Sequence, residues 1–370
     1  MKTKNQRSKK IIIGIICIVL LIVIIIGIVL LVYKLNQLKK LDKMNSSDII
    51  NTITQDDNTT KISVAVINDG IISYHVYGED SMILDNTKFD YEIGSISKTF
   101  VGLMLSKAIS ENKINISASI SEYLTLDKNK YYPTIERLIT HTSGYKGYYF
   151  NKQMISNYFC RGNDFYGINK NEILNKVKKI TLKDKDYKFK YSNFGISIIG
   201  LVLEQVYNKD FVTLMNEFIN KELNLKNTKV AECNGNLSGY WDWKQDDGYI
   251  PAGAIISNIE DMAQYLKYYM EESSPYVTST YAAIKPINAN NFLYEKMNIK
   301  MDKIGMAWLI DEKNTIIWHN GGTSNFNSYI AFNKDKNIGV VVLGNLSPTK
   351  KIPMTVIGAK LMHELINKAK

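Results

Sequence analysis

Residues 94–111 read GSISKTFVGLMLSKAISE, and this stretch decides how the rest of the chain is interpreted. Its apolar residues recur at helical spacing, which predicts a helix from Ser95 to about Glu111 with one buried face. The helix opens with an S-x-x-K motif, and positions i and i+3 share a helix face, so Lys98 would lie one turn from Ser95. The start of a helix also favours a developing negative charge. The stretch therefore indicates a serine nucleophile beside a lysine that adjusts its proton.

The S-x-x-K motif is common enough to occur by chance, so its surroundings must separate one copy from another. Four copies occur in the chain. Ser110 lies at the far end of the predicted helix, Ser143 stands beside Gly144 in a turn, and Ser347 precedes a proline. Only Ser95 opens a long apolar helix.

Two further triplets follow this motif. Tyr191-Ser192-Asn193 comes after Lys190, and His319-Asn320-Gly321 ends a predicted strand and runs into Gly322. With S-x-x-K, Y-[SA]-N and [KH]-[TSA]-G in this order, the chain resembles the serine β-lactamase and penicillin-binding-protein superfamily, specifically its class C β-lactamase-like branch. The segments IERLITHTSG (135–144) and PAGAIIS (251–257) extend the resemblance, which covers roughly residues 60–368.

The resemblance implies a role for each motif residue. Ser95 would attack a carbonyl and become acylated, while Lys98 would tune its proton. Tyr191 would act as general base, as phenolate or through Lys98, and Asn193 would hydrogen-bond the substrate amide and the lysine.

The third motif would line the site with the strand that carries His319 and Asn320. Gly321 would let the backbone approach the substrate closely, and the backbone N–H groups of Ser95 and Gly322 would form an oxyanion hole.

Two positions depart from the β-lactamase pattern. His319 stands where many β-lactamases have lysine, so a cation for a β-lactam carboxylate would be weaker or dependent on pH. Asn320 replaces the usual small hydroxyl residue. Both departures fit the peptidases and esterases of the branch better than β-lactam hydrolysis.

Other residues leave alternatives open. His141 could be the base of a Ser-His-Asp triad, but its H-T-S-G segment is usually structural in the family that the chain resembles. Cys160 and Cys233 could pair if they lie close together. The chain has no P-loop, no strand-linked G-x-G-x-x-G and no H-E-x-x-H, and its four histidines show no metal-ligand spacing. We therefore expect neither a metal nor another cofactor.

Residues 11–33 contain no charged residue and almost nothing polar. As a helix these 23 residues would extend about 34 Å, enough to cross a bilayer core of about 30 Å. A cleavable signal peptide would have a shorter apolar stretch and a small-residue cleavage site. Cys17 could suggest a lipoprotein, but Ile16 precedes it and the apolar run continues past it. Residues 1–10 carry five basic residues and no acid. This pattern predicts a cytoplasmic tail, a retained single-pass signal-anchor and a body outside the cytoplasm.

The remaining chain divides into a polar linker at 34–60 and a body at 61–370. Strands are expected near both ends of the body and helices between them. The predicted strands are 61–68, 71–77, 305–309, 315–319, 328–332 and 338–343, and the predicted helices are 134–140, 170–180, 195–207, 211–223, 259–270 and 352–368. This order predicts an α+β fold whose antiparallel sheet is built from both termini and flanked by helices, with an inserted mainly helical region.

The charge of the chain is unevenly placed. Residues 1–44 hold nine basic residues and one acid, whereas the rest holds 37 basic and 35 acidic residues. The net charge of +10 therefore belongs mainly to the predicted anchor and does not indicate a nucleic-acid partner. We expect a membrane-anchored serine acyl-hydrolase that acts on cell-envelope D-alanyl amides or esters, either in peptidoglycan or in teichoic acid. A β-lactamase, or a β-lactam sensor that acylates without turnover, is the alternative; the oligomeric state stays open.

Overall fold

The computed structural model describes residues 20–29, 32, 35–349 and 352–369. Its contacts divide the chain into two compact units, Met1–Met44 and Asn45–Lys370. In the first unit, residues 20–29 are helical and their large apolar side chains are about half exposed. The predicted span at 11–33 lies partly outside the described residues. Within the described part of the chain, no helix combines the length and apolar character that crossing a membrane requires.

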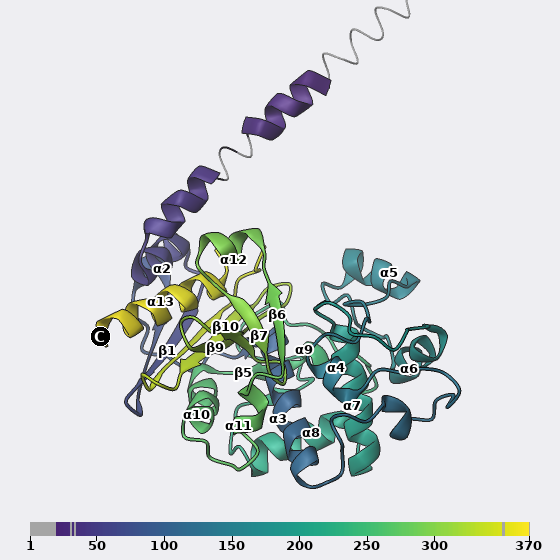
Figure 1. Cartoon of the computed structure of the whole chain (residues 1–370). Coiled ribbons are helices and arrows are strands. Elements are labelled where there is room, and N and C mark those ends of the chain that lie inside the picture. The colour runs from purple at the N-terminus through teal and green to yellow at the C-terminus, as the bar shows by residue number, and fades with distance from the viewer. Residues whose placement is uncertain (1–19, 30–31, 33–34, 350–351, 370) are drawn as a thin grey trace, which may run out of the picture. The chain divides into compact units, whose positions relative to one another are not determined.

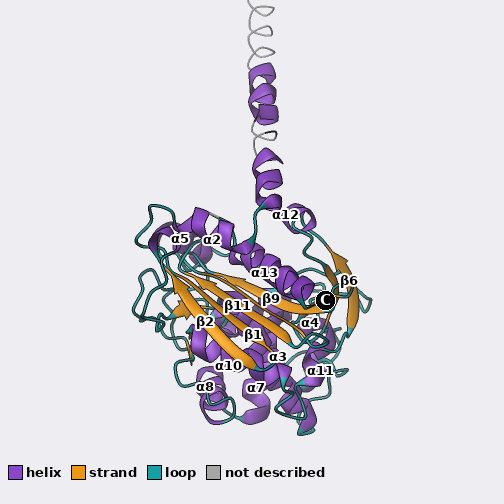
Figure 2. Ribbon diagram, turned by 90° about the vertical axis from the view of Figure 1, so that its left-hand side faces the viewer, coloured by secondary structure: helices purple, strands orange, loops and turns teal. Residues whose placement is uncertain are grey.

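The second unit is built on an eight-stranded antiparallel sheet in the order β2-β1-β11-β10-β9-β8-β7-β6. Its strands are β1 (Ile62–Asn68), β2 (Ile71–Tyr77), β6 (Lys285–Ala289), β7 (Met301–Ile304), β8 (Leu309–Asp311), β9 (Ile316–Gly322), β10 (Asn327–Asn333) and β11 (Ile338–Gly344). Strand β1 pairs with β11, so the sheet joins both ends of the body, as the sequence predicts (Figure 2).

Helices cover both faces of this sheet (Figure 2). Helix α13 (Met354–Lys368) packs on β10 and β11, and α10 (Ile259–Met270) packs on β1, β10 and β11. Every residue of β10 and β11 is buried, because neither face of these central strands meets water. The predicted α+β fold is confirmed.

A mainly helical region is inserted between the first and last strands (Figure 1). Its helices are α3 (Ser97–Ser110), α4 (Ile135–Ile139), α5 (Lys152–Cys160), α6 (Lys170–Lys179), α7 (Asn193–Tyr207), α8 (Phe211–Lys221) and α9 (Ile250–Gly253). Helix α7 contacts α3, α4, α6, α8 and α9 and so forms the centre of this region. A small sheet, in the order β3-β5-β4, connects the region to the main sheet through β3 (Tyr91–Glu92), β5 (Ile255–Ser257) and β4 (Lys229–Val230). The short helices are η1 (Glu79–Ser81), η2 (Gly94–Ile96), η3 (Ile120–Glu122), α11 (Thr278–Tyr281) and α12 (Phe292–Lys296).

Two sequence predictions need correction. The expected strand at 305–309 is a bend, closed by a hydrogen bond from Gly305 N to the Trp308 carbonyl, and β7 and β8 lie on either side of it. The expected linker at 34–60 includes α2 (Ser46–Thr54), which packs against α13. Its isoleucines fall on one face, and Ile49 is fully buried. The polar residues between them hid this spacing, and Asn45 caps the helix through a capping box.

The two cysteines of the body do not form a disulfide. Cys160 is exposed at the end of α5, and Cys233 is half-buried; both are free thiols. The Sγ atom of Cys233 instead accepts a hydrogen bond from Trp243 N at 3.3 Å. The pairing left open by the sequence is therefore absent from the structure.

Candidate active site

The candidate nucleophile lies at a tight turn between β3 and α3. Gly94 has a φ of +49°, in the left-handed region that favours glycine. A Cβ atom there would come within 2.6 Å of the Gly322 backbone nitrogen, so the turn and the end of β9 are in close contact. Ser95 is partly exposed, whereas the residues on both sides of it are buried. The turn thus presents the serine at the surface of a packed core.

Lys98 lies one helical turn from Ser95 and is completely buried. Its Nζ donates to Ser95 Oγ at 2.8 Å and to the Ala252 carbonyl, at the C-terminal end of α9, at 2.5 Å. Burial lowers the pKa of the Lys98 amine well below its usual value. These two bonds account for its hydrogen-bond partners among the described residues, so the predicted bond to Asn193 is not formed. The site instead favours a neutral amine beside the serine.

Tyr191 lies two residues before Asn193, the first residue of α7. Ser192 caps this helix by accepting a hydrogen bond from Gly195 N at 2.9 Å. The cap fixes the backbone beside Tyr191, and Lys98 Nζ lies 5.0 Å from the centre of the Tyr191 ring. Burial raises the pKa of the Tyr191 hydroxyl, although its hydrogen bond with Ser95 acts in the opposite direction. The raised pKa therefore disfavours the phenolate form of Tyr191 in the resting site, which is one of the two forms in which Tyr191 is predicted to act as general base.

His141 holds the segment that carries Tyr191. Its Nδ1 accepts from Ser192 N at 3.2 Å, and its carbonyl oxygen accepts from Lys190 N at 2.8 Å. The imidazole lies 4.6 Å from the Tyr191 ring, centre to centre. Burial lowers the pKa of His141, and Lys98 would act in the same direction only in its charged form. Because Nδ1 already accepts a backbone N–H, His141 supports Tyr191 and does not have the arrangement of a triad base.

The third motif places its side chains on opposite faces of β9, because successive residues of a strand alternate. His319 is buried, and burial is the main cause that lowers its pKa to about 3; Lys98 adds to this shift only in its charged form. Its ring is therefore neutral at physiological pH and supplies no fixed cation. Asn320 points away from this face, and its Nδ2 donates to Tyr294 Oη at 2.8 Å and to Thr355 Oγ1 at 2.9 Å. The side chain of Asn320 therefore lies on the face of β9 opposite to His319.

The glycines of the motif allow β9 to pack against the nucleophile turn. A Cβ atom on Gly321 would lie 1.9 Å from the Ile93 carbonyl oxygen, a distance that no side chain tolerates. Gly322 follows, with its nitrogen beside Gly94. The backbone nitrogens of Ser95 and Gly322, the predicted oxyanion-hole donors, therefore belong to segments in direct contact.

Glu92 is a site residue that the sequence did not reveal. Its Oε2 accepts from Thr323 Oγ1 at 2.5 Å and its Oε1 from Trp241 N at 2.6 Å. It thereby ties β3, just before Ser95, to the end of β9. Burial raises the pKa of Glu92 to about 7, against the effect of both hydrogen bonds. Its partners lie 231 and 149 positions away, so no local pattern could identify them.

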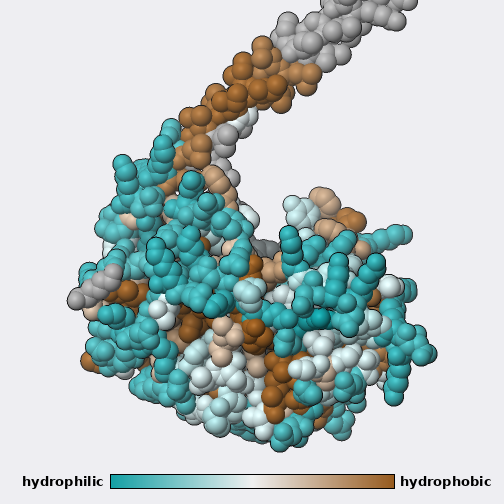
Figure 3. Space-filling view, viewed as in Figure 1, coloured by the Kyte–Doolittle hydropathy of each residue, from teal (hydrophilic) through white to brown (hydrophobic). Residues whose placement is uncertain are grey.

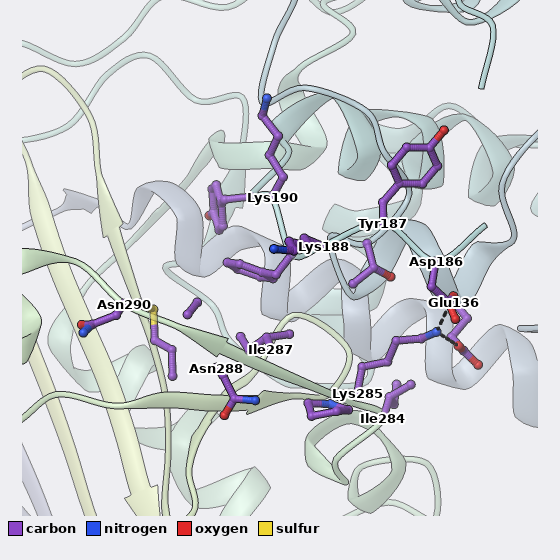
Figure 4. Close-up of a pocket in the computed structure, with 16 residues that line it drawn as sticks. Glu136, Asp186, Tyr187, Lys188, Lys190, Ile284, Lys285, Ile287, Asn288 and Asn290 are labelled. Atoms are coloured by element: carbon purple, nitrogen blue, oxygen red, sulfur yellow. Dashed lines mark ion pairs between the residues drawn. The ribbon is translucent and has the colours of Figure 1, made fainter. Parts of the chain in front are cut away.

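A groove of about 940 Å³ adjoins Tyr191 (Figure 4). One side is formed by residues 186–191 and the other by β6. Lys285 of β6 bridges the two sides through ion pairs with Glu136 at 3.1 Å and Asp186 at 3.5 Å. The groove offers space for a substrate larger than the acyl group that reaches Ser95.

Comparisons with known proteins agree with this arrangement. The family model described as Beta-lactamase matches residues 48–355. Protein flp of Staphylococcus aureus (strain MW2) is 23% identical over 319 residues, which are 77% of this chain and 59% of that protein. This chain therefore spans less than two thirds of that curated relative's length. A beta-lactamase of Providencia stuartii is 23% identical over 343 residues, 80% of this chain and 85% of that enzyme.

The fold is also found among solved structures. The beta-lactamase/D-alanine carboxypeptidase from Yersinia pestis, complexed with citrate, superposes with a TM-score of 0.66 at 18% identity. The match covers 86% of this chain and 96% of that one. Because the family model spans most of the chain and the structure brings its serine, lysine and tyrosine together, the chain belongs to the beta-lactamase family of serine hydrolases.

Proposed function

We propose that this protein is a membrane-anchored, extracytoplasmic serine acyl-hydrolase that acts through an acyl-enzyme on D-alanyl esters or amides of the cell envelope. The observation that carries the proposal is the 2.8 Å contact between Lys98 Nζ and Ser95 Oγ at a buried site that favours uncharged groups. A neutral amine at this distance can take the serine proton directly.

In the proposed acylation, Lys98 Nζ removes the proton of Ser95 as Oγ forms a bond to the substrate carbonyl carbon. The carbonyl electron pair moves onto its oxygen, where the N–H groups of Ser95 and Gly322 would stabilise it. Donors of this kind contribute about 3–4 kcal/mol to the transition state.

The leaving alcohol or amine must gain a proton when the tetrahedral intermediate collapses. The high pKa of Tyr191 keeps its hydroxyl protonated, so we assign Tyr191 to carry the proton from Lys98 to the leaving group. Water then attacks the acyl-enzyme, Lys98 accepts its proton, and the proton returns to Ser95 Oγ as the acid leaves.

His319 supports a substrate without a carboxylate at this position, such as a D-alanyl ester or an internal D-alanyl amide, over a β-lactam. A neutral imidazole cannot form the ion pair with a carboxylate that a lysine would give at this position. Its Nε2 is buried and has no hydrogen-bond partner within the part of the chain that the structure describes. The Yersinia pestis neighbour, described as a D-alanine carboxypeptidase as well as a beta-lactamase, supports the D-alanyl class.

The location is part of the same proposal. Residues 11–33 would cross the cell membrane once, with residues 1–10 in the cytoplasm and the catalytic unit outside. The lipid bilayer and an envelope polymer would then be the two partners of the protein.

A comparison of three substrates tests the proposed activity. The fragment 45–370 is incubated with a D-alanyl ester, a D-alanyl amide and a reporter β-lactam, beside Ser95→Ala. We expect the ester or amide to be turned over at least about tenfold faster than the β-lactam, and all turnover to be lost in the variant. Faster β-lactam turnover would favour the β-lactamase alternative, and labelling by the β-lactam without turnover of any substrate would favour the sensor.

A further inference from the structure

A group of large apolar side chains is exposed on and just before α5. The exposed fraction is 40% for Tyr148, 71% for Phe150, 55% for Ile155, 70% for Tyr158 and 77% for Phe159. We call these five residues the aromatic patch. Figure 1 shows that α5 projects from the helical region, and Figure 3 shows apolar colours on this projecting part. Exposed apolar clusters on a folded domain commonly mark a contact surface.

The orientation of α5 is fixed by hydrogen bonds on its inner side. Met154 and Asn157 are its buried residues, and Asn157 Nδ2 donates to the carbonyls of Asp164 at 3.1 Å and Tyr166 at 2.7 Å. Asn151 caps the helix by accepting from Met154 N at 2.8 Å. Met154 and the polar Asn157 are thus held inward, while Ile155, Tyr158 and Phe159 of the same helix face outward. The hydrogen bonds that orient α5 therefore keep the patch exposed.

The segment that carries the patch has a positive charge, although Glu172 of α6 contacts its helix-capping residue Asn151 at 3.3 Å. Residues 144–162 contain Lys146, Lys152 and Arg161 and no aspartate or glutamate. Lys152 has no ion pair among the described residues, whereas Arg161 pairs with Asp242 at 3.6 Å. Aromatic side chains flanked by cations match the boundary between the headgroups and acyl chains of an anionic bilayer. A protruding helix also suits insertion between lipids better than contact with a flat protein surface.

The patch is connected to the candidate active site. Ser324, two residues beyond Gly322, donates to the carbonyl of Gly162, which follows α5. Trp241 Nε1 in turn donates to Ser324 Oγ at 3.0 Å. A surface bound by α5 would therefore lie beside the rim of the site.

We propose that the aromatic patch is a membrane-contact site that inserts into the surface of an anionic bilayer and holds the active-site rim near it. This contact is additional to the predicted anchor at 11–33. It goes beyond the proposed reaction and rests only on the proposed location of the body outside the cytoplasm.

Vesicle flotation tests the contact. The fragment 45–370, which forms a compact unit by its own contacts, is mixed with phosphatidylglycerol or phosphatidylcholine vesicles. We expect binding to phosphatidylglycerol that weakens with added salt, and binding reduced at least about tenfold by Tyr158→Ser/Phe159→Ser. The matched control is Ile71→Ser/Met82→Ser, which removes exposed apolar side chains at another surface (74% and 60% exposed) and should bind as the wild type. Thermal unfolding of each variant establishes that it is folded.

A second measurement reads insertion directly. The emission of a tryptophan introduced by Phe159→Trp should shift to shorter wavelength on phosphatidylglycerol vesicles and be quenched by brominated lipid. The proposal would be overturned if the wild type did not bind the vesicles, or if Tyr158→Ser/Phe159→Ser bound them equally well. It would also be overturned if brominated lipid did not quench the emission of the introduced tryptophan. Hydrolysis of a soluble ester should be unchanged in Tyr158→Ser/Phe159→Ser, so failure of the contact and failure of the proposed reaction are separate outcomes.

Discussion

Burial determines the chemistry of Lys98. An ammonium taken out of water loses its hydration, and no described carboxylate contributes to the pKa shift that burial produces. The pKa shifts of His319 and Tyr191 also favour their neutral forms. The candidate site therefore favours a neutral resting state, in which a proton can move from serine to lysine without separating charge over a long distance.

This account predicts that a permanent cation at position 98 blocks acylation. Arginine remains protonated at any working pH, so Lys98→Arg should lower the acylation rate by about 10² to 10⁴-fold, the range of general-base catalysis. Stopped-flow measurement of the first turnover checks this. Lys107→Arg, on the same helix α3 but paired with Glu222 near the surface, is the control and should keep the rate. A Lys98→Arg rate within about threefold of the wild type would contradict Lys98 as the base.

The motifs predicted which side chains meet, but not every role. Ser95, Lys98, Tyr191 and His319 come together because each motif fixes a residue at the end of an element. Asn320 was assigned to the site because it belongs to the motif, although strand alternation directs its side chain to the opposite face. The contribution of Ala252 could not be predicted, because its backbone carbonyl makes the contact and any residue supplies one.

At the scale of elements, α2 shows why a polar stretch can belong to the core. Its sequence SSDIINTIT has isoleucines spaced for one helical face, yet polar residues dominate its composition. Ser46 also bonds to α13, donating from N and Oγ to the Glu364 carboxylate at 2.8 and 2.7 Å. The helix is part of the catalytic unit, and the boundary between units falls at Met44 and Asn45.

Removing an isoleucine of α2 should therefore destabilise the whole unit. Ile49→Ala is expected to reduce the free energy of unfolding by about 2–5 kcal/mol, the usual effect of emptying a buried isoleucine site. Urea unfolding of the fragment 45–370 measures it, with the 74% exposed Ile71→Ala as control, expected within about 0.5 kcal/mol of the wild type. An equally small effect at Ile49 would mean that the segment is a linker after all.

The connection between β3 and β9 through Glu92 predicts a pH dependence of stability. The pKa of Glu92 rises from 4.5 to about 7 on folding. The folded state therefore binds the proton more tightly, and stability from this group is complete below about pH 4.5 and lost as the pH rises through 7. No basic side chain contributes to this shift, and Tyr240 and Cys233 are the titratable neighbours that sense the Glu92 charge.

Urea unfolding at pH 5 and pH 8 checks this prediction. From pH 5 to pH 8, the free energy of unfolding of the wild type should fall by up to about 3 kcal/mol more than that of Glu92→Gln, whose side chain has the same shape but cannot ionise. Glu79→Gln, at an exposed position, should follow the wild type. An equal change in the free energy of unfolding between pH 5 and pH 8 for the wild type and Glu92→Gln would contradict the raised pKa of Glu92.

For the whole molecule, the sequence predicted the sheet because its central strands are strongly apolar and turns separate them. It did not predict β6 and β7 at the edge, because partly exposed strands such as KPINA carry no apolar alternation. The groove beside Tyr191 was also unpredictable, since it forms between β6 and residues 186–191, about 100 positions earlier.

The charge distribution predicts where the complete chain is found in a cell. Residues 1–44 combine nine basic residues with the apolar run, while the body is nearly neutral. The full chain should remain in the membrane fraction after an alkaline carbonate wash, which removes peripheral proteins, whereas 45–370 should be released. Release of the full chain under the same wash would contradict a spanning anchor.

The central claim is that Ser95 is acylated and then deacylated. Intact-protein mass spectrometry of the fragment 45–370, quenched in acid during turnover of a D-alanyl ester, tests it most directly. The account predicts a transient mass increase equal to one D-alanyl group, located by peptide mapping to the peptide that contains Ser95, and neither adduct nor hydrolysis in Ser95→Ala. Hydrolysis that persists in folded Ser95→Ala, or an adduct on another residue, would contradict it.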